Sequence, residues 1–387
     1  MTLRVGMIAG EPSGDRLGAE LVTGLRELRP DVEVSGIAGP AMRAAGCEAL
    51  LDSDEIAVMG LVEVLKHYPR LRRLQRRIIR YFVEDPPDLF IGIDAPDFNL
   101  PVEEQCRLVG IPSVHYVSPT VWAWREGRVK KITRATDLVL TIFPFEEDYY
   151  RQFGIPAVFV GHPLADATPD PTDRHAARER LGIAEWRPVL ALLPGSRSGE
   201  MHRHADTFLE TAAICQRAFP DLQCVVPVVN EKRERELRAV LARREANRAV
   251  SDGALVSPLI IQKGTSEVLS AADVVLTASG TAAVEAMLHR RPMVVAYKVA
   301  WASYWIIRAA LKIPYISMPN VLAGQMLVPE FVQGAMKAQD MAQQLLMWLR
   351  EPASAEPLLR EFARLHQTLR RGNGRGAAQT VLELVSN

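Results

Sequence analysis

Twice in this chain, a short apolar strand pattern leads directly into a glycine-containing turn and then into a helical pattern. The first copy is Leu3–Ala9 with the turn Gly10–Asp15, and the second is Val189–Leu193 with the turn Pro194–Arg197. A helix that opens on such a turn presents unpaired N–H groups and the positive end of its dipole, an arrangement that suits phosphate. The two openings predict two nucleotide-binding-type α/β domains that face each other across a cleft.

A third turn of this kind follows Val274–Leu276, where Ser279, Gly280 and Thr281 stand one helical turn before Glu285. The helix start suits a diphosphate, and a carboxylate one turn on can accept hydrogen bonds from both ribose hydroxyls. In the second turn, the guanidinium of Arg197 can pair bidentately with phosphate oxygens. We predict a nucleotide site here, against the simpler interpretation of capping residues and a surface arginine.

Short, uninterrupted apolar runs dominate the predicted strands, which is typical of parallel strands buried on both faces. Helical stretches such as Arg16–Leu28 separate them, as in a doubly wound sheet. The expected strands of the first half are Leu3–Ala9, Val32–Ile37, Leu89–Ile93, Ser113–Val117, Leu138–Thr141 and Ala157–Val160. Those of the second half are Val189–Leu193, Cys224–Val229, Ala254–Val256, Val274–Leu276 and Met293–Ala296.

The alternation breaks around Gly161–Thr172, where prolines and aspartates indicate a linker. We therefore expect a first Rossmann-like domain over residues 1–164 and a second over residues 165–350. The tail, residues 351–387, has a helical pattern interrupted by proline, and we expect it to pack back on an N-terminal domain, either its own or that of a partner subunit.

Composition excludes some classes of function. The 387 residues contain 46 Lys and Arg and 46 Asp and Glu, and this zero net charge argues against a nucleic-acid partner. The four cysteines show no C-x-x-C spacing and predict buried thiols in a reducing compartment. Since there is neither a leader-like start nor an apolar run of roughly 18 residues, we expect a cytoplasmic protein.

One carboxylate stands directly after a buried strand of the first half. Asp94 follows Leu89–Ile93, and a partly desolvated carboxylate at a strand end is a candidate general base, with helix capping as the alternative. Asp97 is predicted to be its structural partner or a cap. The turn Gly10–Asp15 ends the first strand and is expected to contact a ligand, unless its glycines serve only tight packing.

Polar and aromatic residues follow the next strand. His115 lies within it, and Trp122 and Trp124 come after it. For the tryptophans we favour a place in the core over stacking on a ligand. A buried histidine with satisfied hydrogen bonds is the usual structural interpretation of a residue such as His115.

A strongly basic segment lies between Glu63 and Glu84, with apolar residues at helical spacing and a break near Pro69. A basic amphipathic helix is typical of proteins that bind an anionic membrane surface, and a solvated helix face is the equally weighted alternative. The expected membrane-contact residues are Leu65, Arg70, Arg72, Arg73, Arg76, Arg77 and Arg80.

Two metal-like patterns are set aside, and we expect neither a metal nor a cofactor. His202 and His204 lack further ligands nearby, and Asp52-Ser53-Asp54 spells a D-x-D motif that belongs to a different transferase fold.

Together these residues resemble the lipid-A-disaccharide synthases, inverting glycosyltransferases of the GT-B type in Gram-negative bacteria, over essentially the whole chain. The segments that carry the resemblance are Ala9–Asp15, Ala57–Gly60, Ile91–Asn99, His115–Pro119, Val121–Trp124, Leu193–Arg197, Ala278–Thr281 and Pro319–Asn320.

The resemblance implies transfer from UDP-2,3-diacylglucosamine to 2,3-diacylglucosamine 1-phosphate, giving a β-1′,6-linked disaccharide 1-phosphate and UDP. It also implies a cytoplasmic enzyme on the inner membrane and a homodimer with exchanged C-terminal segments. Asp94 aligns with the family's essential aspartate, Arg197 with its UDP-binding arginine, and Glu285 and Asn320 with nucleotide-site residues. On this model the acceptor side of the site comprises Glu11, Ser13, Gly14, Asp15 and His115.

Three other functions are weighed against this one. A UDP-N-acetylglucosamine 2-epimerase has the same two-domain plan and needs no acylated acceptor. An NAD-dependent oxidoreductase would require G-x-G-x-x-G and an acidic residue further on, which neither of the first two glycine turns has. A non-catalytic lipid or nucleotide binder would tolerate the loss of Asp94.

Overall fold

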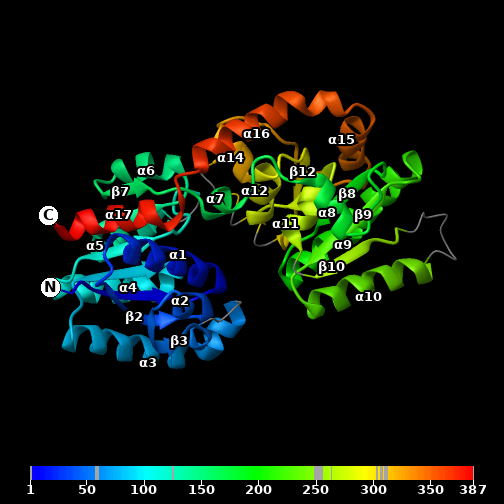
Figure 1. The fold of residues 1–387 in the computed structure, drawn as a ribbon. Helices are drawn as coiled ribbons and strands as arrows, with labels where there is room; N and C mark the ends of the chain where they lie inside the picture. The colour runs from blue at the N-terminus through cyan, green and yellow to red at the C-terminus, as the bar shows by residue number, and fades with distance from the viewer. Residues whose placement is uncertain are drawn as a thin grey trace. The chain divides into compact units, whose positions relative to one another are not determined.

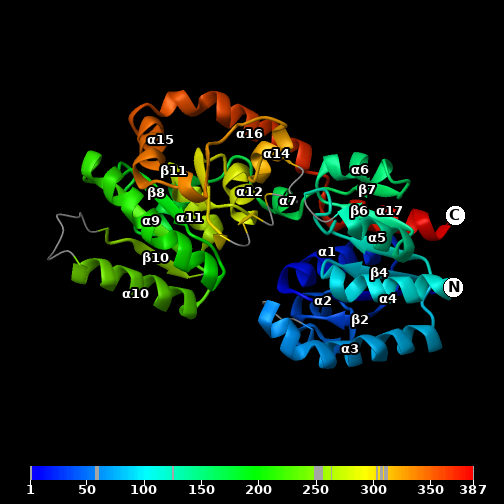
Figure 2. The ribbon, with the colours of Figure 1, turned by 180° about the vertical axis from the view of Figure 1, so that it is seen from behind.

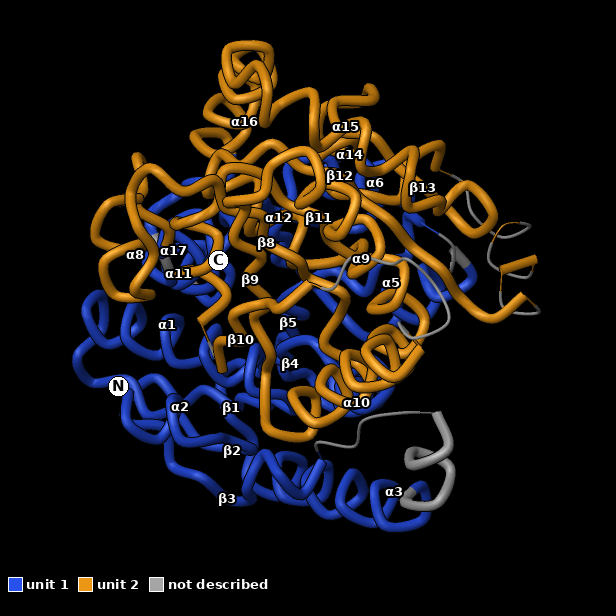
Figure 3. The backbone as a smooth tube through the Cα atoms, turned by 90° about the vertical axis from the view of Figure 1, so that its right-hand side faces the viewer, with its two compact units in different colours: residues 1–167, 369–387 blue, residues 168–368 orange. Residues whose placement is uncertain are grey.

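The computed structural model describes residues 2–56, 61–123, 126–247, 256–262, 264–301, 304–305, 308 and 313–386. It divides into two compact units (Figure 3). Unit 1 comprises residues 1–167 and 369–387, and unit 2 comprises residues 168–368.

The strands described in unit 1 form one parallel sheet in the order β3-β2-β1-β4-β5-β6-β7. Their bounds are β1 Arg4–Ala9, β2 Glu33–Ala38, β3 Glu48–Asp52, β4 Leu89–Ile93, β5 Ser113–Tyr116, β6 Leu138–Thr141 and β7 Ala157–Phe159. The strand order reverses direction between β1 and β4. In open α/β sheets, ligands bind at the carboxyl ends of the strands beside such a reversal.

Helices cover both faces of this sheet (Figures 1 and 2). The helices are α1 Pro12–Leu28, α2 Pro40–Ala44, α3 Leu61–Glu84, α4 Pro96–Leu108, α5 Val129–Ala135, α6 Pro144–Arg151, α7 Pro163–Ala167 and α17 Asn373–Ser386, with 3-10 turns η1 Ser53–Glu55 and η2 Glu126–Arg128. In β1, Val5 and Met7 pack with α1 and α17, whereas Ile8 packs with α3 and α4. This alternation explains why the strands read as continuous apolar runs.

The strands described in unit 2 form a second parallel sheet in the order β10-β9-β8-β11-β12-β13. Their bounds are β8 Val189–Leu193, β9 Gln223–Val228, β10 Leu259–Gln262, β11 Val274–Ala278, β12 Met293–Tyr297 and β13 Glu330–Val332. The helices are α8 Arg174–Arg180, α9 Ser198–Ala218, α10 Glu231–Asn247, α11 Thr265–Ala271, α12 Thr281–Leu288, α14 Met318–Ala323, α15 Ala338–Arg350 and α16 Glu356–Leu369, with 3-10 turns η4 Gln333–Ala335 and η5 Pro352–Ala355. Its order reverses between β8 and β11.

The two doubly wound sheets confirm the predicted fold class. The division of the chain differs from the expected one at two places, because the first unit extends to residue 167 and the tail is split. Residues 351–368 belong to unit 2, and only residues 369–387 return to unit 1, where α17 packs beside α1 of the same chain. Of the predicted strand Ala254–Val256, residues 254–255 lie outside the described residues and Val256 is not in a strand; the strand of this region, β10, begins at Leu259.

Candidate functional site

The carboxyl ends of β4 and β5 in unit 1 carry most of the unusual backbone conformations. Six non-glycine residues have positive φ among those the structure describes, and four of them, Asp94, Ala95, Val117 and Thr120, follow these two strands. A β-branched valine at a φ of 80° is strained. Such strain clusters at functional sites, because it persists only where the surrounding structure enforces it.

Asp94 is the first residue of the turn after β4, with a φ of 51°, and its side chain is half-buried. Its backbone N–H donates to the Tyr116 carbonyl at 2.8 Å. The buried Asn99 amide donates to the carbonyls of Ile93 and Asp94 at 3.1 and 2.8 Å. These bonds fix the left-handed turn and with it the position of the carboxylate.

Asp94 opens onto a cavity of about 330 Å³ beside the reversal point of the sheet. Its walls combine polar groups with apolar ones, and its lining residues are Gly10, Glu11, Ile56, Tyr68, Leu71, Arg72, Gln75, Asp94, Ala95, Pro96, Asp97 and Phe98. On its α3 side, Arg72 donates to the Gln75 side chain at 3.0 Å, and Gln75 donates to the Phe98 carbonyl at 2.7 Å. A carboxylate, a guanidinium and apolar walls thus meet in one pocket.

The predicted role of Asp97 as a partner of Asp94 or a cap is not what the structure shows. Its exposed carboxylate accepts two bonds from Arg128, at 2.7 and 2.9 Å.

Two residues expected on the acceptor side are buried and engaged elsewhere. The Asp15 carboxylate accepts from the backbone N–H groups of Gly39, Ala41 and Met42 and so caps the start of α2. His115 is fully buried and lies 2.7 Å from the equally buried Glu103. Both side chains are thus held by partners within the protein, and their place on the acceptor side stays a prediction. Of the other predicted residues in that turn, Glu11 and Ser13 are exposed and Gly14 is buried.

Sequence reasoning missed Asn99 and Glu103, although both lie behind the Asp94 turn. Asn99 belongs to the segment Ile91–Asn99 that carries the family resemblance. Nothing in the sequence, however, indicates that its side chain bonds the carbonyls of the Asp94 turn. The pairing of Glu103 with His115 joins a helix to a strand, and only the fold brings the two together.

In unit 2 the turns after β8 and β11 flank the reversal point of the second sheet. Gly195 has a φ of 122°, and a Cβ there would stand 2.4 Å from the Glu200 Cβ, so the tight turn requires glycine. The Arg197 side chain is 82% exposed and extends from this turn at the start of α9. It lies 3.9 Å from the Glu200 carboxylate, a distance that leaves it available to an anion.

The turn at Ser279, Gly280 and Thr281 opens α12. Gly280 caps this helix with a φ of 141°, and no atom lies within 4 Å of the place where its Cβ would be. The start of the helix is thus open to a ligand. The Ser279 hydroxyl donates to the Ile316 carbonyl at 2.7 Å, and Glu285 is half-buried one turn into α12.

The described hydrogen bonds of Asn320, in α14, all lie within the protein. It is fully buried, and its amide donates to Val328 O and Glu330 while its oxygen accepts from the N–H groups of Leu327 and Val328. All of these bonds are to the protein and order the chain between α14 and β13, and the assignment of Asn320 to the nucleotide site stays a prediction.

A structural role also explains His204, which the sequence placed in a metal-like pattern. Its ring bridges the Pro194 carbonyl, at 2.8 Å, and the Lys298 N–H, at 2.9 Å, and burial lowers its pKa. Among the described residues, the structure contains no group of side chains that could hold a metal ion.

The basic segment forms one helix, α3, that continues through Pro69. The side chains of Arg70, Arg72, Arg73, Arg76, Arg77 and Arg80 are all exposed. On the opposite side, Ile78 and Phe82 pack into the core. The helix is therefore amphipathic as predicted. The side chain of Leu65 lies outside the described residues.

The two tryptophans that follow β5 can be compared only in part, since Trp124 lies outside the described residues, as do Ala57–Gly60. Trp122 is buried and donates to Glu146, which confirms its place in the core.

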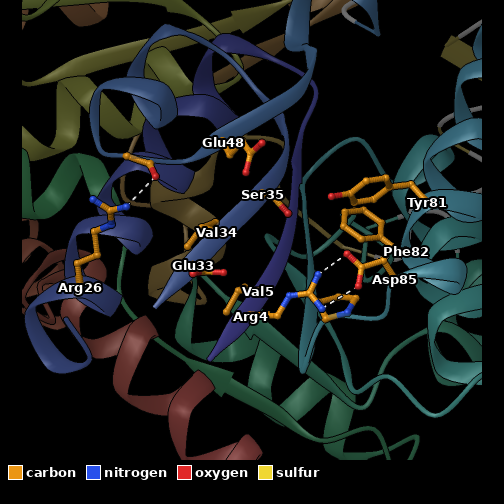
Figure 4. Close-up of a pocket in the computed structure, with 12 residues that line it drawn as sticks. Arg4, Val5, Arg26, Glu33, Val34, Ser35, Glu48, Tyr81, Phe82 and Asp85 are labelled. Atoms are coloured by element: carbon orange, nitrogen blue, oxygen red, sulfur yellow. Dashed lines mark hydrogen bonds and ion pairs between the residues drawn. The ribbon is translucent and has the colours of Figure 1, made fainter. Parts of the chain in front are cut away.

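A second cavity of about 330 Å³ lies at the amino ends of the strands of the unit 1 sheet (Figure 4). The first residues of β1 and β2 line it, Arg4 pairs with Asp85, and Arg26 donates to the Gly46 carbonyl at 2.9 Å. Because parallel sheets bind their ligands at the carboxyl ends of the strands, the Asp94 cavity is the better candidate.

In the part of the chain that the structure describes, no helix combines the length and the apolar character needed to cross a bilayer.

Comparison with known proteins gives one consistent family. The model described as lipid-A-disaccharide synthetase matches residues 5–381. The lipid-A-disaccharide synthase of Alkalilimnicola ehrlichii is 45% identical over 382 residues, which cover 98% of this chain and 98% of the relative. That of Pseudomonas aeruginosa PAO1 is 46% identical over 384 residues, covering 99% of this chain and 98% of the relative.

Solved structures share the fold at low identity. The UDP-GlcNAc 2-epimerase of Neisseria meningitidis, bound to UDP-GlcNAc, has a TM-score of 0.63 at 12% identity and covers 100% of this chain and 99% of its own. Anabaena HepE, in complex with UDP and glucose, has a TM-score of 0.57 at 15% identity and covers 100% of both chains. A glycotransferase of kitacinnamycin has a TM-score of 0.60 at 16% identity, with 98% of each chain covered.

Proposed function

Because the chain belongs to the lipid-A-disaccharide synthase family, we propose that it joins UDP-2,3-diacylglucosamine to 2,3-diacylglucosamine 1-phosphate. The products are the β-1′,6-linked tetraacyl disaccharide 1-phosphate and UDP. The observation that carries this proposal is identity of about 45% with synthases along nearly the full length of both chains. The epimerase of Neisseria meningitidis shares the fold at only 12% identity and gives the alternative function no comparable support.

Inversion at the anomeric carbon requires a single in-line displacement. We assign Asp94 as the general base that accepts the proton of the acceptor's 6-hydroxyl. As that oxygen forms its bond to the anomeric carbon, the bond to the UDP oxygen breaks and its electron pair leaves with UDP. The strained, clamped turn supports this assignment, since it holds the carboxylate at the edge of a cavity with apolar walls.

The leaving group gains negative charge as the bond breaks. We assign Arg197 and the open start of α12 at Ser279–Thr281 to the diphosphate, and Glu285 to the ribose. A charge-assisted contact to developing charge contributes roughly 2–4 kcal/mol to lowering a barrier. The exposed guanidinium and the unobstructed approach to Gly280 support this assignment.

Both substrates carry acyl chains, so the enzyme must collect them from a bilayer. We propose that the protein is peripheral on the cytoplasmic face of the inner membrane and binds anionic lipid through the six exposed arginines of α3. Tyr68 of the same helix is 52% exposed and lines the Asp94 cavity, which links the membrane face to the acceptor site. In unit 2, Trp301 and Trp305 are 60% and 59% exposed, and tryptophan is typical of membrane interfaces.

The purified protein, given both substrates, is expected to yield the disaccharide 1-phosphate by mass spectrometry, with UDP released only when the acylated acceptor is present. Release of UDP without the acceptor, or interconversion of UDP-N-acetylglucosamine with its 2-epimer, would contradict the proposal and favour an epimerase.

A further inference from the structure

One arginine of α3 differs from the others in where it lies. Arg72 lines the Asp94 cavity, and the other exposed arginines of this helix do not. Among the described residues that line the cavity, Arg72 is the one cation, and the acidic residues are Glu11, Asp94 and Asp97. Arg128 already pairs with Asp97 through two hydrogen bonds. The positive charge of the cavity is thus concentrated at one point of its wall, on the α3 side.

The Arg72 guanidinium is held by its neighbours without being neutralised. Its Nη1 donates to Gln75 Oε1 at 3.0 Å, and the guanidinium carbon lies 5.7 Å from the centre of the Tyr68 ring. Gln75 is 3% exposed and donates in turn to the Phe98 carbonyl at 2.7 Å, in the first turn of α4. A guanidinium has five N–H donors, and among the described residues only Gln75 accepts from this one. Its charge is therefore fixed in place and still available to an anion.

The proposed acceptor carries two groups that this cavity must treat differently. Its 6-hydroxyl must reach the Asp94 carboxylate, whereas its 1-phosphate is a monoester with a negative charge of about 1.5–2 at pH 7. Beside the Asp94 carboxylate the phosphate would be repelled, so it requires a cation of its own. The cavity, at about 330 Å³, has the size of a small-molecule site and can take a sugar headgroup.

We propose that Arg72 binds the anomeric phosphate of the acceptor and thereby selects a phosphorylated sugar. This inference rests on the proposed function, in which the acceptor is a sugar 1-phosphate. A planar guanidinium pairs with two phosphate oxygens at once, and the bond to Gln75 fixes the direction of that pairing. With the phosphate at Arg72 and the 6-hydroxyl at Asp94, the headgroup is held at two points and enters the reaction in one orientation. The phosphate itself makes and breaks no bond.

The test compares Arg72→Gln with the unaltered protein, using two water-soluble acceptors that differ only at C1. They are short-chain 2,3-diacylglucosamine 1-phosphate and the corresponding methyl glycoside, and calorimetry measures the Kd of each. Arg72→Gln is expected to weaken binding of the phosphorylated sugar by about 10- to 100-fold, the usual effect of losing hydrogen bonds between charged groups. Binding of the methyl glycoside is expected to stay the same. An unchanged Kd for the phosphorylated sugar, or equal losses for both sugars, would overturn the proposal.

The matched control is Arg73→Gln. Arg73 is the next residue of the helix and is also exposed, but it donates to the Pro69 carbonyl at 3.3 Å and does not line the cavity. Both variants remove one positive charge from α3, so a general attraction of this helix for anions would weaken binding equally in both. Because no membrane is present, Arg73→Gln is expected to bind the phosphorylated sugar as the unaltered protein does. Equal losses in the two variants refute a specific site at Arg72.

Kinetics with the donor separates this inference from the proposed function. The phosphate contact is the same before and during the transfer, so Arg72→Gln is expected to raise KM for the phosphorylated acceptor about 10- to 100-fold with kcat unchanged. If disaccharide forms and this KM does not change, the inference fails and the synthase reaction stands. If no disaccharide forms but binding of the sugar phosphate still depends on Arg72, the proposed function fails and the phosphate site stands.

Discussion

Asp94 adopts the left-handed backbone conformation, which aspartate tolerates better than most residues. The next residue, Ala95, adopts the same conformation at a φ of 42°, although alanine has no side-chain hydrogen bond to favour it. The Asn99 clamp and the bond to Tyr116 hold both in place. The position of the carboxylate is thus fixed by the conformation of its turn, which Asn99 and Tyr116 hold. Its substitution therefore tests chemistry with little effect on the fold.

At this scale we expect Asp94→Asn to reduce kcat by about 10²- to 10⁴-fold, because the amide cannot accept the hydroxyl proton. Steady-state kinetics measures this loss of turnover, and calorimetric titration measures UDP affinity, which is expected to stay unchanged. Arg197→Ala is the converse variant: the same titration is expected to show weaker UDP binding. Near-normal turnover by Asp94→Asn would remove Asp94 as the base.

The sequence located the turns that carry Asp94 and Arg197, but not the partners of the buried side chains. Asp94 and Arg197 lie at strand-to-helix turns, a position that the apolar pattern locates by itself. The buried ends of Asp15, His115 and Asn320 depend instead on which backbone groups and side chains the tertiary structure brings to them. No spacing along the chain encodes those partners.

At the scale of elements, the central strands and the edge strand β7 were predicted from the sequence, whereas the edge strands β3 and β13 were not. β1 and β4 are buried on both faces and read as continuous apolar runs. β3 and β13 are edge strands of the first and second sheet, and only Leu51 among their residues is buried. Their sequences therefore carry neither a continuous nor an alternating apolar signal. The displacement of β10, a half-buried edge strand, has the same cause.

The α3 helix yields a prediction at this scale. Its described arginines face solvent on a helix whose acidic residues stand only at Glu63 and Glu84. Each arginine near an anionic surface contributes about 1 kcal/mol, so replacing Arg73, Arg76 and Arg80 by Gln is expected to weaken binding to anionic vesicles on the order of a hundredfold. Vesicle co-sedimentation measures this change.

The control replaces three exposed arginines of α10, Arg235, Arg238 and Arg243, in the same way. In α10 the basic residues alternate with acidic ones, so vesicle binding is expected to change little. Equal losses in the two triple variants would show that α3 has no special role at the membrane.

At the scale of the whole molecule, unit 1 depends on a segment from the far end of the chain. Ala377, Ala378 and Val381 of α17 pack into the same core as Leu21 and Leu25 of α1. Two glycines allow the helices to approach: a Cβ at Gly374 would stand 2.2 Å from the Glu20 carbonyl, and one at Gly24 would stand 2.8 Å from the Gly374 carbonyl. The sequence predicted that the tail is helical and returns, but not that it divides between the two units.

Gly374→Ala is expected to push α17 away from α1 and to lower the free energy of unfolding by about 1–3 kcal/mol, the usual cost of overpacking. Gly376→Ala is the matched control, because its Cβ would meet its nearest atom at 3.6 Å. In that helical position alanine is expected to be neutral or to stabilise by about 0.5–1 kcal/mol. Urea unfolding measures the free energy of unfolding of both variants. Equal values would show that the close approach of α17 to α1 does not require glycine at position 374.

The route of the chain also sets an order of events during synthesis. Unit 2 is continuous in sequence, so all of its strands have left the ribosome before α17 is made. Unit 1 begins first but closes last, because the face of its sheet that carries Val5 and Met7 waits for a helix translated some 200 residues after the rest of that unit. For most of translation the nascent chain therefore exposes an apolar surface that a chaperone, or the α17 of another copy, can cover before its own arrives.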